Sequence, residues 1–472
     1  MTQYEGEVRR SAETVERLHR RRLSFTDQDL IRVVADPSYG RWLDLIKAIG
    51  GCAHPIYLSG STTTFDAGTG EIRHQYSSDE EPGGRLPVRC GNRRHSRCPS
   101  CAYLHQGDTY QLVRSGLRGG KGVPAGVSAH PRAFLTLTAP SFGPVHRATS
   151  NGACRPRRAA ERCEHGVPAE CRAVHLDGDV IGSPLCSACY DYTSHVLWNA
   201  TAGTLWNRYC QTFRRRLAAA GGLSQSDLRK VAVVSFAKAA EYQRRGAIHF
   251  HAVIRVDGKD GPASSAPSWI TSDLLCGVAR EAADATELTT PYADAIGEIV
   301  MRWGEQIDVH PITSVANGLG AHLTDDAVAS YIAKYITKSD DHGGVDYRIR
   351  NRAQIELAPV SDHVRSLMTT CWRLSLLAEL NQLNLSAWIH SLGFRGHVLT
   401  KSRKYSTTYR ELQEERAEFA RGESDSGAVT VADWRYVGSG YSLAESDIAA
   451  GIAEDAKNLR ALRKELREEE EL

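Results

Sequence analysis

The cysteines constrain the fold of this chain more than any other feature of its sequence. Ten of the twelve lie between Cys52 and Cys210 of a chain of 472 residues. The N-terminus carries no signal-peptide pattern and no apolar run is long enough to cross a membrane, so we expect a cytoplasmic protein with no membrane partner. Thiols in a cytosolic chain indicate metal binding rather than disulfide formation.

The first Cys-x-x-Cys motif, Cys98-Pro-Ser-Cys101, predicts a zinc site. Cys90 lies eight residues before it, and these three thiolates need a fourth ligand to complete a structural tetrahedral site. The candidates for the fourth ligand are Cys52, His95, His105 and Cys154. A redox-active Cys-x-x-Cys is the competing interpretation, but no thioredoxin-like βαβ pattern surrounds this motif.

The second motif, Cys186-Ser-Ala-Cys189, predicts a zinc ribbon. Paired with Cys163 and Cys171 it supplies four thiolates, although Cys154 could replace either of these upstream cysteines. The surrounding segment is rich in Arg, Pro and Gly and poor in apolar residues, so it needs a metal to fold. We therefore expect about two structural zinc ions per chain, given four ligands per site.

A predicted β-hairpin over residues 239–255 carries a second group of possible metal ligands. His249 and His251 flank Phe250, so in a strand both imidazoles point to one face. A turn with an odd number of residues places Glu241 of the preceding strand on that same face.

Two imidazoles and one carboxylate leave open positions on an ion. Such a site suits a hard divalent ion, Mg²⁺ or Mn²⁺, that must also accept phosphate oxygens. Glu241 is the preferred third ligand beside His249 and His251, and Gln243 is the second choice. The alternative is that the two histidines are simply the polar face of a half-buried strand.

A predicted helix over residues 328–338 contains a doubled Tyr-x-x-Lys motif. Tyr331 and Tyr335 are four residues apart and share one helix face, and Lys334 and Lys338 share a neighbouring stripe. A tyrosine pair at this spacing is ordinarily a packing feature. A lysine three residues after each tyrosine, however, can contact a phosphate or stabilise a phenolate.

Together these motifs resemble the HUH endonucleases that start rolling-circle replication. The doubled Tyr-x-x-Lys resembles the branch of that family with two tyrosines. The wider pattern, with Cys90-Gly-Asn-Arg-Arg and Leu392-Gly-Phe-Arg-Gly-His397, is similar to replication initiators of actinobacterial plasmids and integrative conjugative elements, over roughly residues 85–440.

The resemblance implies an α+β fold: a five-stranded antiparallel HUH-type sheet flanked by helices, here with zinc-binding cysteine-rich insertions. It also implies nicking and rejoining of one DNA strand at a single-stranded or hairpin origin, through a 5′-phosphotyrosine, with host replication proteins as partners. The implied catalytic residues are Tyr331, Tyr335, Lys334 and Lys338.

On this basis we expect five parts in the chain. They are an N-terminal helical region over 1–85, a first zinc-binding cluster over 86–125, a nuclease domain over 126–149 and 191–400, a zinc-ribbon insertion over 150–190, and a charged C-terminal tail over 401–472. The net charge is only +2, so DNA affinity must come from local basic patches.

Two other functions remain open from the sequence. A single-strand transposase would use the same catalytic residues, and only the wider resemblance favours an initiator. A non-enzymatic zinc-ribbon DNA-binding protein would contain the same cysteines, with the His-x-His pair in a structural role.

Overall fold

The computed structural model describes residues 24–147, 152–154, 162–175, 180–313, 323–338, 344–421 and 427–470. The chain divides into two compact units, Met1–Gly107 with Gln413–Leu472, and Asp108–Leu412. The two divisions fall inside α4 (Pro99–Arg118) and α11 (Tyr409–Arg421) and differ from the predicted boundaries. No helix in the described part of the chain is both long and apolar enough to span a membrane.

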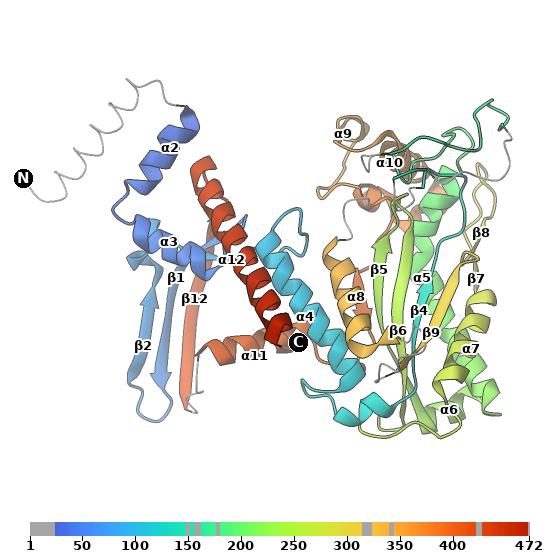
Figure 1. The fold of residues 1–472 in the computed structure, drawn as a ribbon, viewed down its shortest axis with the longest axis horizontal. Helices are drawn as coiled ribbons and strands as arrows, with labels where there is room; N and C mark the ends of the chain where they lie inside the picture. The colour runs from blue at the N-terminus through green and yellow to red at the C-terminus, as the bar shows by residue number, and fades with distance from the viewer. Residues whose placement is uncertain are drawn as a thin grey trace, which may run out of the picture. The chain divides into compact units, whose positions relative to one another are not determined.

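The first unit contains a small antiparallel sheet, although a helical region was expected over 1–85. Its strands are β1 (Ile56–Asp66), β2 (Ile72–Ser77), β3 (Leu86–Val88) and β12 (Ala428–Ser439), in the order β12-β1-β2 with β3 also paired to β1. Its helices are α2 (Phe25–Val34), α3 (Tyr39–Ala48) and α12 (Leu443–Glu470) (Figure 1).

The segment predicted as a charged tail contributes regular structure to this unit. β12 pairs with β1 along its length, from Ile56↔Ser439 to Asp66↔Ala428. Ala449 of α12 is fully buried in a core that also contains Trp42 and Ile46 of α3. The segment expected as a tail is therefore in part regular structure, in which charges occupy exposed faces while small apolar residues make the contacts.

The second unit is built on a six-stranded sheet, one strand more than predicted. Its strands are β4 (Arg132–Leu137), β5 (Ala232–Tyr242), β6 (Ile248–Gly258), β9 (Ile307–Thr313), β10 (Leu323–Thr324) and β11 (Leu399–Lys401), in the order β10-β9-β4-β6-β5-β11. β10 pairs parallel with β9, and the other pairs are antiparallel. Strands as short as β10 carry no alternation that a sequence pattern can reveal.

Helices cover both faces of this sheet. They are α5 (Tyr192–Ala220), α6 (Gln225–Val231), α7 (Ser272–Asp284), α8 (Asp325–Lys338), α9 (Arg352–Glu356) and α10 (Asp362–Leu374), and the strands β7 (Glu287–Thr289) and β8 (Val300–Arg302) form a separate ribbon. Figure 1 shows α5 and α7 on one face of the sheet and α8 on the other.

Strand alternation divides the core between these two faces. Leu135 and Phe250 pack on the side of α5, while Phe134 packs on the side of α8 with Ile332 and Ile336. Both isoleucines are almost fully buried. Burial of each contributes about 1.5–3 kcal/mol, which fixes the tyrosine-bearing helix on the sheet.

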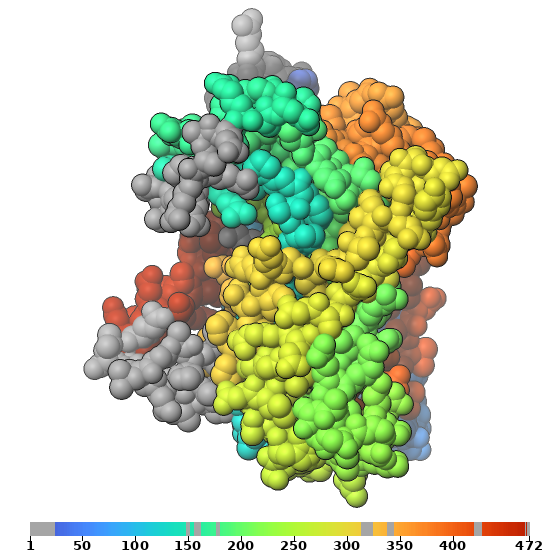
Figure 2. Space-filling model, turned by 90° about the vertical axis from the view of Figure 1, so that its right-hand side faces the viewer, coloured from blue at the N-terminus to red at the C-terminus, as the bar shows by residue number. Residues whose placement is uncertain are grey.

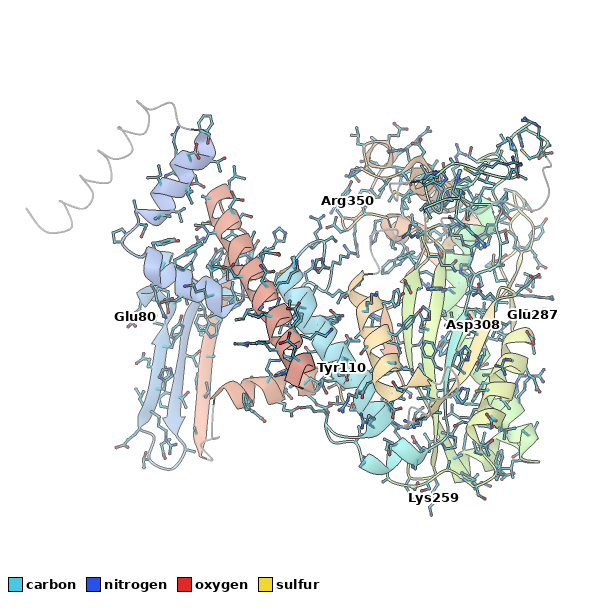
Figure 3. The ribbon with its side chains drawn as sticks, viewed as in Figure 1. Glu80, Tyr110, Lys259, Glu287, Asp308 and Arg350 are labelled. Carbon is cyan, nitrogen blue, oxygen red and sulfur yellow. The ribbon has the colours of Figure 1, made fainter. Side chains whose placement is uncertain are left out.

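Two aspartates anchor the N-terminus of α8. Asp325 and Arg132 of β4 form a buried ion pair with an Nη1–Oδ1 distance of 2.5 Å. Asp326 accepts hydrogen bonds from Tyr110, which Figure 3 labels on α4, and from two arginines of the same helix. The Thr324 hydroxyl caps the helix by accepting a hydrogen bond from the Ala327 amide at 3.2 Å. Carboxylates in the first turn also favour the helix dipole.

We expect Asp325→Ala to destabilise the second unit by about 3–5 kcal/mol, because it leaves the Arg132 charge buried without its carboxylate. Asp326→Ala is the matched control, since Asp326 is half exposed and its loss should cost only about 1 kcal/mol. Urea denaturation followed by fluorescence measures both. Equal losses from the two variants would show that the Arg132–Asp325 pair has no special role.

Candidate functional site

The β5–β6 hairpin brings Glu241, His249 and His251 together. Glu241 lies directly opposite His249 in the register of the two strands. The connecting loop has five residues and turns at Gly246, whose φ is +82°. The Glu241 Oε2 atom lies 2.9 Å from His249 Nε2 and 3.1 Å from His251 Nε2. The loop therefore has the odd number of residues that places Glu241 on the face of the two histidines.

These distances fit a divalent metal ion. Adjacent ligands in an octahedron with bonds of about 2.1 Å lie about 3.0 Å apart. The ligand atoms of Glu241, His249 and His251 all lie within 4.8 Å of one another. The second-choice ligand, Gln243, lies in the turn, where its side-chain oxygen accepts a hydrogen bond from Arg245 Nε at 2.9 Å.

The protonation states of this group also suit a metal. Burial acts to raise the pKa of Glu241, but hydrogen bonds with His249 and His251 outweigh it, so the Glu241 pKa is lowered and the carboxylate form is favoured. Burial lowers the pKa of His251, which keeps its imidazole neutral. Ionised carboxylate and neutral imidazole are the forms that bind metal ions.

Two residues of β4 orient His251. The Thr136 hydroxyl lies 3.0 Å from His251 Nδ1, which directs Nε2 toward Glu241. The Phe134 ring stacks on the imidazole with centroids 6.0 Å apart and an angle of 5° between the planes. Strand alternation therefore places Phe134 and Thr136 on the face of the sheet that the histidines occupy.

Asp308 is a residue of this face that the sequence did not single out. It lies on β9, directly opposite Thr136 (Figure 3), and its side chain is exposed. Cross-strand partners share a face of the sheet, so Asp308 and Thr136 lie on the same side as His251. Asp308 therefore adds a second carboxylate to this face of the sheet, outside the group of Glu241, His249 and His251.

The tyrosine helix places both phenol rings beside this group. The Tyr331 hydroxyl lies 3.4 Å from His251 Nε2, and the Tyr335 ring is 4.5 Å from the Tyr331 ring and 5.8 Å from His251. Burial, together with Tyr335 and the charge of Glu241, raises the pKa of Tyr331 above its ordinary value. A cation beside the phenol would be needed to activate it at neutral pH.

The structure describes the two lysines of the Tyr-x-x-Lys motifs less completely than the two tyrosines. Lys334 is exposed on α8, and no interaction among the described residues joins it to the metal-ligand group. Lys338 is the last residue of α8, and its side chain lies outside the described part of the chain.

The first cysteine group contains four thiols, and its fourth member is Cys52. The Sγ atom of Cys52 lies 3.8 Å from that of Cys98 and 3.7 Å from that of Cys101, and Cys90 lies 3.7 Å from Cys101. Tetrahedral zinc with Zn–S bonds of about 2.3 Å requires thiolates about 3.8 Å apart. Of the four candidates left open by the sequence, only Cys52 is in this group.

The predicted zinc ribbon of Cys163, Cys171, Cys186 and Cys189 is not formed as such. Cys163, Cys186 and Cys189 gather with a histidine, His165, whose Nδ1 lies 3.1 Å from Cys189 Sγ. Cys171 lies in a different group, with His146, Cys154 and His175. The spacing of the cysteines alone could not separate the two groups, because the prediction assigned four thiolates to one site and did not include the histidine ligands.

These features define the class of the protein. It is an α+β protein with groups of cysteine, histidine and glutamate side chains that are able to hold metal ions. The chain belongs to the RepSA family of replication initiators, since the family model described as "Replication initiator protein, pSAM2" matches residues 38–454. The resemblance to replication initiators is thereby confirmed.

A relative from Streptomyces ambofaciens, described as "Replication initiator protein", is 43% identical to this chain over 456 residues. The match covers 93% of this chain and 95% of the relative. No solved structure matches the chain.

Proposed function

We propose that this initiator nicks and rejoins one strand of its origin through a 5′-phosphotyrosine, which starts rolling-circle replication. The observation that carries the proposal is the Tyr331 hydroxyl 3.4 Å from His251 Nε2, in a group where Glu241, His249 and His251 fit a divalent ion. Nucleophile and metal ligands thus meet at one point, as phosphoryl transfer requires.

The residues of the chain have distinct parts in this reaction. Mg²⁺ or Mn²⁺ bound by Glu241, His249 and His251 would supply Lewis-acid polarisation of the scissile phosphate. The Tyr331 oxygen loses its proton and attacks the phosphorus, and the bond from phosphorus to the 3′ oxygen breaks. The 3′ oxygen takes up a proton and becomes the primer hydroxyl.

The second tyrosine makes the reaction repeatable. The phosphotyrosine bond preserves the energy of the phosphodiester, so a 3′-OH can reverse the attack and rejoin the strand without ATP. Tyr335 lies on the same helix face as Tyr331 and would attack the regenerated junction. Host replication proteins would extend the primer in the cytoplasm.

A cavity of about 1060 Å³ at the turn of the β5–β6 hairpin would provide a path for the DNA strand. It is lined by the hairpin turn Gln243–Arg245, by residues 138–141 after β4, by Arg147 and by residues 303–306. Figure 2 shows the segment after β4 in cyan between the teal insertion and the yellow chain that leads to β9. Arg147 and Arg244 are exposed here and would contact backbone phosphates.

We also propose that the cysteine groups hold structural zinc. Thiolates are soft ligands, and the spacing of Cys52, Cys90, Cys98 and Cys101 fits the tetrahedral geometry that zinc adopts. Cys163 with His165, Cys186 and Cys189 offers a second set of three thiolates and one imidazole. These ions would stabilise the fold rather than take part in the strand transfer.

The proposed activity is tested by incubating the protein with a single strand that carries the origin. We expect a covalent protein–DNA band in Mn²⁺, and none after the divalent ion is removed with EDTA. Binding of the strand without any covalent band in either Mg²⁺ or Mn²⁺ would instead indicate a non-enzymatic DNA-binding protein. The family match favours an initiator over a transposase of the same chemistry.

A further inference from the structure

The metal-binding side chains around the insertion alternate between two groups along the sequence. His146 and Cys154 belong to one group, and the next pair, Cys163 and His165, belongs to the other. The chain then returns to the first group with Cys171 and His175, and to the second with Cys186 and Cys189. The first and third pairs thus meet at one point, and the second and fourth pairs meet at another.

The distances within the first of these groups fit a tetrahedral zinc ion. Tetrahedral bonds of about 2.0 Å to nitrogen and about 2.3 Å to sulfur place two nitrogens about 3.3 Å apart and a nitrogen and a sulfur about 3.5 Å apart. The observed distances are 3.2 Å from His146 Nδ1 to His175 Nε2, 3.8 Å from Cys154 Sγ to His146 Nδ1, and 3.5 Å from Cys171 Sγ to His175 Nε2.

We propose that His146, Cys154, Cys171 and His175 bind a third zinc ion, and that this Cys₂His₂ site and its neighbour form one interleaved, cross-braced unit. Two imidazoles and two thiolates are a complete ligand set for structural zinc. With no ligand position left open, the ion at this site would brace the chain and take no part in catalysis.

The local backbone supports this arrangement. Isolated β-bridges pair Ala153 with Val174 and Arg162 with Pro168, which bring the ligand-bearing segments together without a regular sheet. Most side chains of the described residues 162–175 are exposed or only half buried, so they cannot form an apolar core of their own. Two zinc ions, each bound by two ligand pairs that alternate along the sequence with those of the other ion, supply the missing cross-links.

The site also braces the catalytic hairpin. His146 exchanges backbone hydrogen bonds with the second side of the insertion, to Ser183 and from Gly182, both at 2.9 Å. Gly182 packs directly on the β5–β6 turn, since a Cβ atom there would lie only 2.3 Å from the Arg244 carbonyl oxygen. The proposed zinc ligand His146 is therefore hydrogen-bonded to Gly182, and Gly182 contacts the turn between Glu241 and His249.

The zinc content of the full-length protein, purified with zinc and measured by native mass spectrometry, tests this inference. We expect three zinc ions per chain, with Cys154 and Cys171 both protected from alkylation. During slow removal of zinc by a chelator, these two thiols should become labelled with one shared rate. Two ions per chain with Cys154 labelled before any chelator is added, and Cys171 labelled together with Cys163, would overturn the proposal.

Substitution of the histidine ligands separates the two sites without removing a thiol. His175→Ala should lower the zinc content from three to two and expose Cys154 and Cys171 first. His165→Ala is the matched control and should expose Cys163, Cys186 and Cys189 first. His175→Cys, which restores a ligand, should again bind three ions. Full zinc content in His175→Ala would contradict the proposed site.

Discussion

His249→Ala is expected to abolish nicking, with a fall in rate of at least about 10³-fold, which corresponds to about 4 kcal/mol of lost transition-state stabilisation. The variant removes one of the two imidazoles that contact Glu241. The remaining two ligands would bind the ion weakly and leave the scissile phosphate unpolarised. The same result is expected for His251→Ala. The rate of cleavage of a labelled origin strand in Mg²⁺ and in Mn²⁺ measures the effect.

Two other variants calibrate this result. Thr136→Val keeps the metal ligands but removes the hydroxyl 3.0 Å from His251 Nδ1, and a loss of about 10- to 100-fold is expected for such an orienting residue. His74→Ala removes an exposed histidine of β2 in the first unit and should leave the rate near that of the unaltered protein. DNA binding should persist in all of them. Near-normal cleavage by His249→Ala or His251→Ala would show that the hairpin does not hold the catalytic ion.

The double variant Tyr331→Phe with Tyr335→Phe is expected to form no covalent adduct at all. Each single variant should still form one through the remaining tyrosine, because the two rings lie 4.5 Å apart on one helix face. Each should nevertheless fail to complete a full replication round. We expect Tyr331→Phe to slow the first nick more, since the Tyr331 hydroxyl is the one in contact with His251. Peptide mapping of the adduct identifies the tyrosine used.

Tyr292→Phe is the matched control for this series, because Tyr292 is exposed and lies between β7 and β8, away from the hairpin. The competing mechanism has a single nucleophile and one packing tyrosine. It would be supported if one single substitution removed every adduct while the other changed nothing, and alternating attack would then be excluded.

The parts of the site that are close in sequence were predictable from local geometry. Strand alternation placed Glu241, His249 and His251 on one face, and the four-residue helical spacing placed Tyr331 beside Tyr335. These regularities depend only on the local φ and ψ angles, so they can be predicted without knowledge of the rest of the fold. The convergence of these side chains is observed, and their catalytic roles remain predictions.

Contacts between distant segments were not predictable in the same way. Cys52 lies 38 residues before Cys90, and Cys171 joins Cys154 rather than the nearer Cys163. The entropy of closing a loop changes only slowly with its length, so sequence spacing hardly distinguishes one partner from another. The pairing of β12 with β1 was missed for the same reason.

The pairing of β1 with β12 has a consequence for how the protein folds during its synthesis on the ribosome. The hydroxyls of Thr64 and Thr430 meet at 3.1 Å although 366 positions separate them, whereas the second unit is one continuous stretch, Asp108–Leu412. During synthesis the second unit can therefore fold while β1, already paired with β2 and β3, still lacks β12 on its other edge. Until β12 emerges, that edge of β1 is open to other chains, so we expect the closing of the first unit to be a slow and aggregation-prone step in the folding of this initiator.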